Sequence, residues 1–154
     1  MATMLHFALV VHIAGIVLLA GSTVMNYIIS KHFWATLQID QNKAIAINSA
    51  TLNFEMVTRV GGVITILSGF LMVAILGKVV TSQTWFHFKM ILVLLIIVNS
   101  LLFARPQNSR LKKLILSGSV NFGAYSDVKS KMNYYYLLQL IMILAIFVLS
   151  VFKF

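Results

Sequence analysis

The side chains that could take part in chemistry are few, and they lie within apolar stretches of the sequence. The ionisable ones are His6, His12, Arg59, His87 and Lys89. An ionisable group is costly at membrane depth, so each one is a candidate functional residue. An imidazole or a neutral amine can bind a metal ion through its nitrogen lone pair. Paired carboxylates and an H-E-x-x-H motif do not occur in these stretches, so the sequence does not indicate an intramembrane aspartyl protease or a zinc hydrolase.

Helical periodicity places His12 on a small and polar face. At about 100° per residue, Gly15, Thr23 and Asn26 share that face with His12. The rest of this helix is apolar, so we expect the face to point into a bundle. His6 lies about 120° away and closer to the helix end, where an interfacial position is expected.

His87 and Lys89 are roughly 200° apart on one helix, so they cannot both face the same partner. Lys89 shares its side with Ser100, whereas His87 shares its side with apolar residues. The pattern therefore favours Lys89 pointing inward and His87 lying near the outer headgroups. In the alternative interpretation, Lys89 extends its amine to the outer surface.

The elements that must position these residues follow from composition and hydropathy. The 154 residues are 60% hydrophobic and 10% charged, with no cysteine, which excludes an ordinary soluble domain and a disulfide scaffold. Apolar runs long enough to cross about 30 Å of hydrocarbon should be helical, because lipid offers the backbone no hydrogen-bond partners. We predict a single all-α membrane domain over residues 1–154, with helices at about 4–29, 56–76, 85–103 and 134–152.

Basic residues predict how this four-helix bundle is oriented. The chain contains twelve Lys and Arg residues but only three Asp and Glu residues. Most of the basic residues lie in the connections 30–55 and 104–133. This is a topology signal and does not indicate nucleic-acid binding, so both connections should be cytoplasmic. The bundle is then up-down-up-down with both termini on the outer side. The short connection 77–84 predicts that the second and third helices are antiparallel neighbours, and Glu55 and Arg59 are spaced for an ion pair.

A basic and apolar segment occurs in the second connection, at 110–116. It has two interpretations, an amphipathic segment on the inner membrane surface or the cytoplasmic end of the third helix. The pattern favours the helix end.

Small and polar residues on the other helices complete a candidate cofactor site. Gly62 and Gly69 permit close approach of a neighbouring backbone or a flat ligand, and Tyr136 lies on the polar stripe of the last helix. A histidine in an apolar bundle, faced by small residues, is the arrangement that haem b uses. We expect His12 to bind the iron and Gly15 to leave room for the macrocycle.

The second axial ligand would be Lys89, with His87 as the alternative. A lysine binds iron only as the neutral amine, and burial disfavours the charged form. In the competing interpretation no haem is bound, and His12 forms a hydrogen bond across the bundle.

Two segments resemble the HemJ-type membrane protoporphyrinogen IX oxidases and the related CopD-like small membrane proteins. They are VHIAGIV at 11–17 and WFHFKMILVL at 85–94. In the HemJ-type family, a first-helix histidine and a lysine in a Trp-x-His-x-Lys context are associated with haem b, and His12 and Lys89 match these positions. The resemblance implies a redox protein, most naturally of the bacterial inner membrane. At the last helix the chain reads NYYY at 133–136 where the family has Asn-Glu-x-Pro, which favours haem binding over porphyrinogen oxidation.

The sequence therefore predicts a haem b protein that transfers electrons in the membrane or oxidises protoporphyrinogen, with a redox partner or a second copy as possible associates. Its catalytic residues, if it is an enzyme, stay unassigned. The alternative is a haem-free subunit or scaffold of a larger membrane complex.

Overall fold

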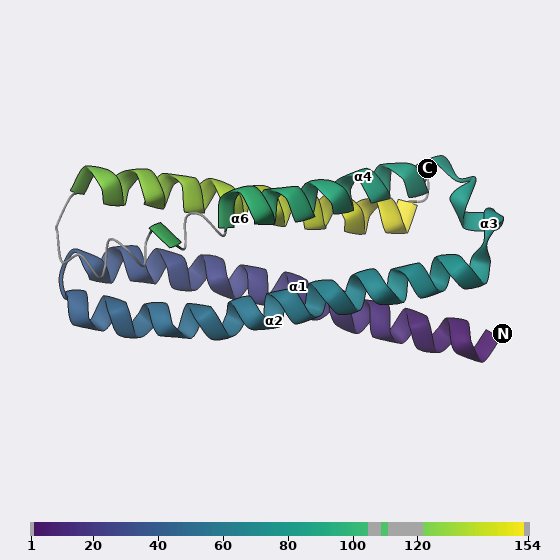
Figure 1. Ribbon diagram of the computed structural model, residues 1–154, viewed down its shortest axis with the longest axis horizontal. Coiled ribbons are helices and arrows are strands. Elements are labelled where there is room, and N and C mark those ends of the chain that lie inside the picture. The colour runs from purple at the N-terminus through teal and green to yellow at the C-terminus, as the bar shows by residue number, and fades with distance from the viewer. Residues whose placement is uncertain (1, 105–108, 111–121, 153–154) are drawn as a thin grey trace.

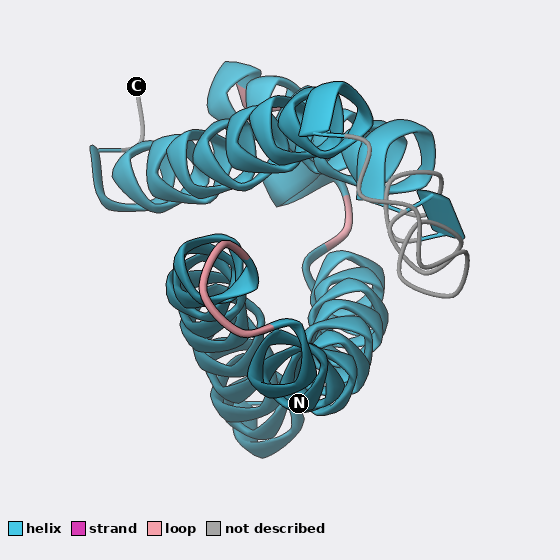
Figure 2. Ribbon diagram, turned by 90° about the vertical axis from the view of Figure 1, so that its left-hand side faces the viewer, coloured by secondary structure: helices cyan, strands magenta, loops and turns pink. Residues whose placement is uncertain are grey.

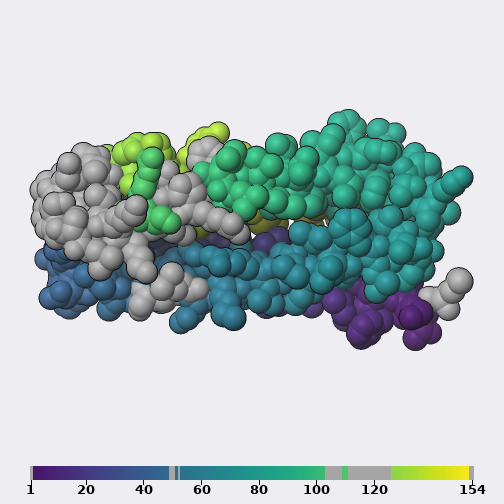
Figure 3. Space-filling model, viewed as in Figure 1, coloured from purple at the N-terminus to yellow at the C-terminus, as the bar shows by residue number. Residues whose placement is uncertain are grey.

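The computed structural model describes residues 2–104, 109–110 and 122–152, and these residues form helices without any strand. The helices are α1 (Ala2–Leu37), α2 (Gln41–Leu76), the one-turn α3 (Lys78–Thr81), α4 (Thr84–Asn99), the π-helix η1 (Ser100–Ala104) and α6 (Phe122–Phe152). Four helices are long and apolar enough to cross a membrane. The predicted all-α class with four apolar helices is confirmed, and the body is elongated along the helix axes (Figure 3).

The first two helices are much longer than their apolar runs. Each contains 36 residues, which corresponds to about 54 Å against about 30 Å of hydrocarbon. Residues 30–55, expected to be a connection, are helical except for a turn at 38–40. The reason is local: residues 22–60 contain neither glycine nor proline, so the residues that interrupt a helix most strongly are absent on both sides of this turn.

Asp40 begins α2 as its N-cap. Its carboxylate accepts a hydrogen bond from the backbone N–H of Lys43 at 3.1 Å, and this bond holds the pKa of Asp40 below its usual range. The exposed Lys43 ammonium adds an ion pair at 3.7 Å. A capped start directly after α1 folds α2 back along α1, and the two helices pack closely along their length (Figure 1).

The other two long helices form a second pair. The left-handed Gly77, with φ of 55°, ends α2, and α3 leads into α4. We expected α4 to neighbour α2 because their connection is short, but in the described residues α4 packs most closely against α6. Figure 2 shows the two pairs end on, and Figure 1 shows the start of α1 and the end of α6 at the same end of the molecule.

The main buried apolar cluster lies at the opposite end, where the turn between α1 and α2 is located. Two aromatic residues of α1, Phe33 and Trp34, pack edge to face with ring centroids 4.9 Å apart. The cluster continues onto α2 and α6 and comprises Phe33, Trp34, Ala44, Val128, Met132, Tyr135 and Tyr136. Most of these residues belong to the predicted connections, so helices replace loops there and bury a core of their own.

Candidate functional site

The imidazole of His12 is directed at α2. Its Nδ1 lies 3.0 Å from the hydroxyl oxygen of Ser68, and the ring is half-buried. The other residues of the predicted inward face, Gly15, Thr23 and Asn26, are buried, which confirms the orientation of that face. Ser68 was not predicted as the partner of His12, because periodicity gives the face of a helix but not its register against a neighbour.

Lys89 makes a corresponding contact in the other helix pair. Its Nζ donates a hydrogen bond to the hydroxyl of Ser150 on α6 at 3.0 Å. Lys89 also lies close enough to His12 to act on it electrostatically, although the two residues belong to different helix pairs. The ion pairs of the described chain are Lys43 with Asp40, Arg59 with Glu55, and Lys131 with Asp127, and Lys89 takes part in none of them. The site therefore contains two nitrogen bases from separate helices.

His87 and His6 are both exposed. The Nδ1 of His87 lies 3.0 Å from the carbonyl oxygen of Gln83 one turn earlier on the same helix. Its ring also packs edge to face against Phe86 at 6.0 Å. As the periodicity predicted, His87 is exposed, whereas Lys89 is half-buried and directs its amine at α6.

The predicted glycines have different surroundings. A Cβ atom on Gly15 would lie only 2.6 Å from the hydroxyl of Thr65, so Gly15 brings α1 and α2 together and leaves no room there for another group. Gly69 borders the ring of His12, whose Cε1 would be 3.3 Å from an added Cβ. Gly62 is more open, since a Cβ there would meet only a side-chain carbon of Leu19 at 3.7 Å.

Tyr136 lies away from these residues. It is 4% exposed in the apolar cluster, edge to face with Tyr27 at a ring distance of 6.3 Å. Tyr27 follows His12 by fifteen residues, about 22 Å along α1. The structure therefore does not bring Tyr136 to His12, and its position reflects packing between α1 and α6.

A buried amide pair joins α4 to α6 near that cluster. Asn99 Nδ2 donates to Gln139 Oε1 at 3.0 Å, and the two side chains are 4% and 2% exposed. The π-helix η1 begins at the next residue. Asn99 and Gln139 belong to different helices, so their contact depends on the register between α4 and α6 and is seen only in the structure.

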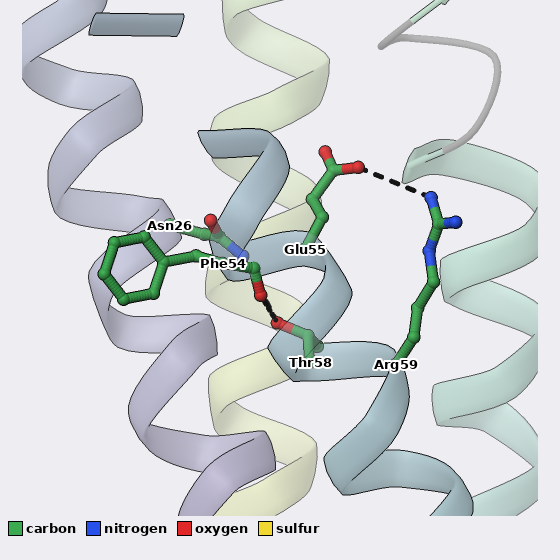
Figure 4. Close-up of polar contacts among 5 residues, drawn as sticks. All are labelled: Asn26, Phe54, Glu55, Thr58 and Arg59. Atoms are coloured by element: carbon green, nitrogen blue, oxygen red, sulfur yellow. Dashed lines mark hydrogen bonds and ion pairs between the residues drawn. The ribbon is translucent and has the colours of Figure 1, made fainter. Parts of the chain in front are cut away.

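Two polar side chains of α2, Thr58 and Arg59, form hydrogen bonds one turn back along the same helix. Arg59 donates to Glu55 at 3.5 Å, which confirms the predicted ion pair, and Arg59 points away from α1 (Figure 4). Thr58 donates to the backbone carbonyl of Phe54 at 2.8 Å. Asn26 of α1 donates in turn to the hydroxyl of Thr58 at 3.3 Å. Of these contacts, the one between Asn26 and Thr58 joins α1 to α2.

Within the described residues there is no group of three or more His, Cys, Asp or Glu side chains that could hold a metal ion. A haem does not require such a group, because the porphyrin supplies the other ligands of its iron and the protein supplies only one or two, such as His12 and Lys89. Residues 111–121, which include most of the basic and apolar segment, lie outside the described residues.

The chain was compared with protein-family models, curated proteins and solved structures, and none of the three comparisons gave a match.

Proposed function

We propose that this chain is an integral membrane protein that binds haem b between α1 and α4, with His12 and Lys89 as the axial ligands and a redox role. The observation that carries the proposal is the placement of two nitrogen bases. They come from different helix pairs, and each contacts a serine of a neighbouring helix. The resemblance of segments 11–17 and 85–94 to the HemJ-type oxidases supports the same pair of ligands.

The surroundings of His12 suit such a group in three respects. Nδ1 is the ring nitrogen engaged by Ser68, so Nε2 is available to a metal. α4 does not pack closely against α1 or α2, so close packing of these helices does not exclude a group between them. Gly62 adds an open position on α2, whereas Gly15 is covered by Thr65.

Haem b, when bound, would supply a reversible one-electron couple. The residues of this chain would hold its iron through His12 and Lys89 and keep water away with apolar helices. Electron transfer to a membrane partner is the role we favour, and oxidation of protoporphyrinogen is the second possibility in the same class. The distribution of basic residues supports both chain ends on the outer side of a bacterial inner membrane, with the turn between α1 and α2 in the cytoplasm.

The test is the optical spectrum of the protein purified from haem-replete cells. We expect a Soret band that shifts on reduction with dithionite, its loss in His12→Ala, and an altered band in Lys89→Ala. His87→Ala is the matched control, because this histidine lies on the same helix as Lys89 and faces outward. A colourless protein that also fails to take up added haem contradicts the proposal and favours the haem-free scaffold. Porphyrinogen oxidation requires a separate turnover assay with a defined electron acceptor.

A further inference from the structure

Two serines make the same contact on two different helices. The hydroxyl of Ser68 donates its proton to the carbonyl of Ile64 at 2.6 Å, with the Thr65 carbonyl 3.1 Å away. The hydroxyl of Ser150 donates to the carbonyl of Ile146 at 2.7 Å. A hydroxyl has a single proton, so after this donation its oxygen can only accept.

The single proton of the Ser68 hydroxyl determines the direction of the hydrogen bond between Ser68 and His12. His12 Nδ1 lies 3.0 Å from the Ser68 oxygen, so with the Ser68 proton on the Ile64 carbonyl it is Nδ1 that carries a proton and donates it. In the neutral ring Nε2 then holds the lone pair. Lys89 Nζ donates to the Ser150 oxygen at 3.0 Å, which directs one N–H into α6. Ser68 therefore fixes the imidazole whose Nε2 would bind a metal, and Ser150 orients Nζ itself.

We propose that Ser68 and Ser150 are positioning residues: Ser68 holds His12 as the Nδ1–H tautomer, with the lone pair on Nε2, and Ser150 holds the amine of Lys89 in one orientation. The inference rests on the proposed function as far as haem is concerned. The tautomer of His12, however, is a property of the chain without any ligand. A hydrogen bond from the non-ligating nitrogen of a histidine fixes the ring and raises its basicity, and loss of such a partner typically weakens metal binding by about 10- to 100-fold.

The first experiment uses the full-length protein without haem in detergent micelles. The ¹⁵N shifts of its imidazoles are recorded at about pH 8, where neutral rings dominate, and His12 is assigned by its loss in His12→Gln. We expect the Nδ1–H tautomer in the natural protein and a shift towards Nε2–H in Ser68→Ala. An Nε2–H ring in the natural protein overturns the inference, whether or not the protein binds haem.

The second experiment is a haem titration followed by redox potentiometry. Ser68→Ala should weaken haem binding by about 10- to 100-fold and move the midpoint potential in the positive direction, because a less basic imidazole stabilises ferric iron less. Ser68→Thr keeps the hydroxyl and should restore both properties. Ser150→Ala should change the spectrum in the same sense as Lys89→Ala, but less strongly.

Ser22→Ala is the matched control. Ser22 is also buried between α1 and α2, donates to the carbonyl of Leu18 at 2.5 Å, and its oxygen lies 2.8 Å from the hydroxyl oxygen of Thr58. It touches neither candidate ligand, so its loss reports only the structural cost of removing such a serine. If Ser68→Ala and Ser22→Ala bind haem alike and with the same midpoint potential, Ser68 has no positioning role, even though haem binding itself stands. If the natural protein takes up no haem, the proposed function fails and the tautomer measurement alone decides the role of Ser68.

Discussion

The contact between α1 and α2 depends on two glycines, and this gives a sharp test of the packing. A Cβ added to Gly61 would lie 2.7 Å from the backbone nitrogen of Leu19 and 3.0 Å from the carbonyl oxygen of Gly15. Ordinary contacts of a Cβ begin at 3.4 Å, so the helices would have to separate by about 0.7 Å at this point. The opposing atoms belong to the backbone, which cannot rotate away as a side chain can.

Gly61→Ala should therefore destabilise the protein, and Gly62→Ala should not. Overpacking of this kind costs about 1–3 kcal/mol. Alanine also gains about 1 kcal/mol over glycine in helix propensity, but this gain is common to both variants. Since a Cβ on Gly62 would meet only a side-chain carbon of Leu19 at 3.7 Å, the difference between the two variants isolates the clash. We expect Gly61→Ala to be less stable than Gly62→Ala by about 1–3 kcal/mol.

The assay is reversible unfolding in mixed micelles, in which the free energy of unfolding is extrapolated to the absence of denaturing detergent. Gly21→Ala is a second control, because nothing lies within 4 Å of the position that its Cβ would take. The separation should also lengthen the contact of His12 with Ser68, two turns further along α2, and shift the imidazole tautomer. Equal stabilities for Gly61→Ala and Gly62→Ala would refute the close helix approach.

Three further predictions concern the other contacts. Asn99→Leu leaves Gln139 without its buried partner and should lower the free energy of unfolding by about 1–3 kcal/mol. A double-mutant cycle with Gln139→Leu should give a coupling energy of about 0.5–2 kcal/mol. Additive effects of the two substitutions on stability would contradict the pair. Because the pKa of Asp40 is lowered in the folded chain, its cap is present above the usual carboxyl pKa and is lost as pH falls through the lowered value. Amide exchange at Lys43 should then accelerate on acidification, relative to its intrinsic rate, in the natural protein but not in Asp40→Ala. Haem at about 100 times its dissociation constant should add about 2.7 kcal/mol to the free energy of unfolding, and His12→Ala should abolish this gain.

The sequence predicts where the chain can cross a membrane better than it predicts where the helices end. Hydropathy detects residues that prefer lipid, but a helix can extend beyond such a run where its residues pack against a neighbouring helix. The absence of glycine and proline over 22–60 was the available signal for the long helices, and Asp40 was the signal for the turn. Phe33 and Trp34 show the consequence, because they pack in a core that a loop would not have formed.

The candidate site was predictable to a similar degree. Periodicity assigned His12 to the inward face and separated Lys89 from His87, because both inferences depend only on angles around one helix. Ser68 and Ser150 could not be identified in this way, since their contacts depend on the register between helices. That register is set partly by the approach at Gly61, which only three-dimensional packing reveals.

The distribution of contacts gives the candidate site a structural consequence. The hydrogen bond of His12 remains within the α1 and α2 pair, and that of Lys89 remains within the α4 and α6 pair. Contact between the pairs is closest for α1 with α6, through aromatic rings such as Tyr27 and Tyr136 in the cluster at the far end of the bundle. Because His12 lies about 22 Å from that cluster along α1, a group bound by both His12 and Lys89 would join the two pairs at a second place, away from the cluster. The free energy of such binding would then tighten the association of the pairs, as well as tune the potential of an iron.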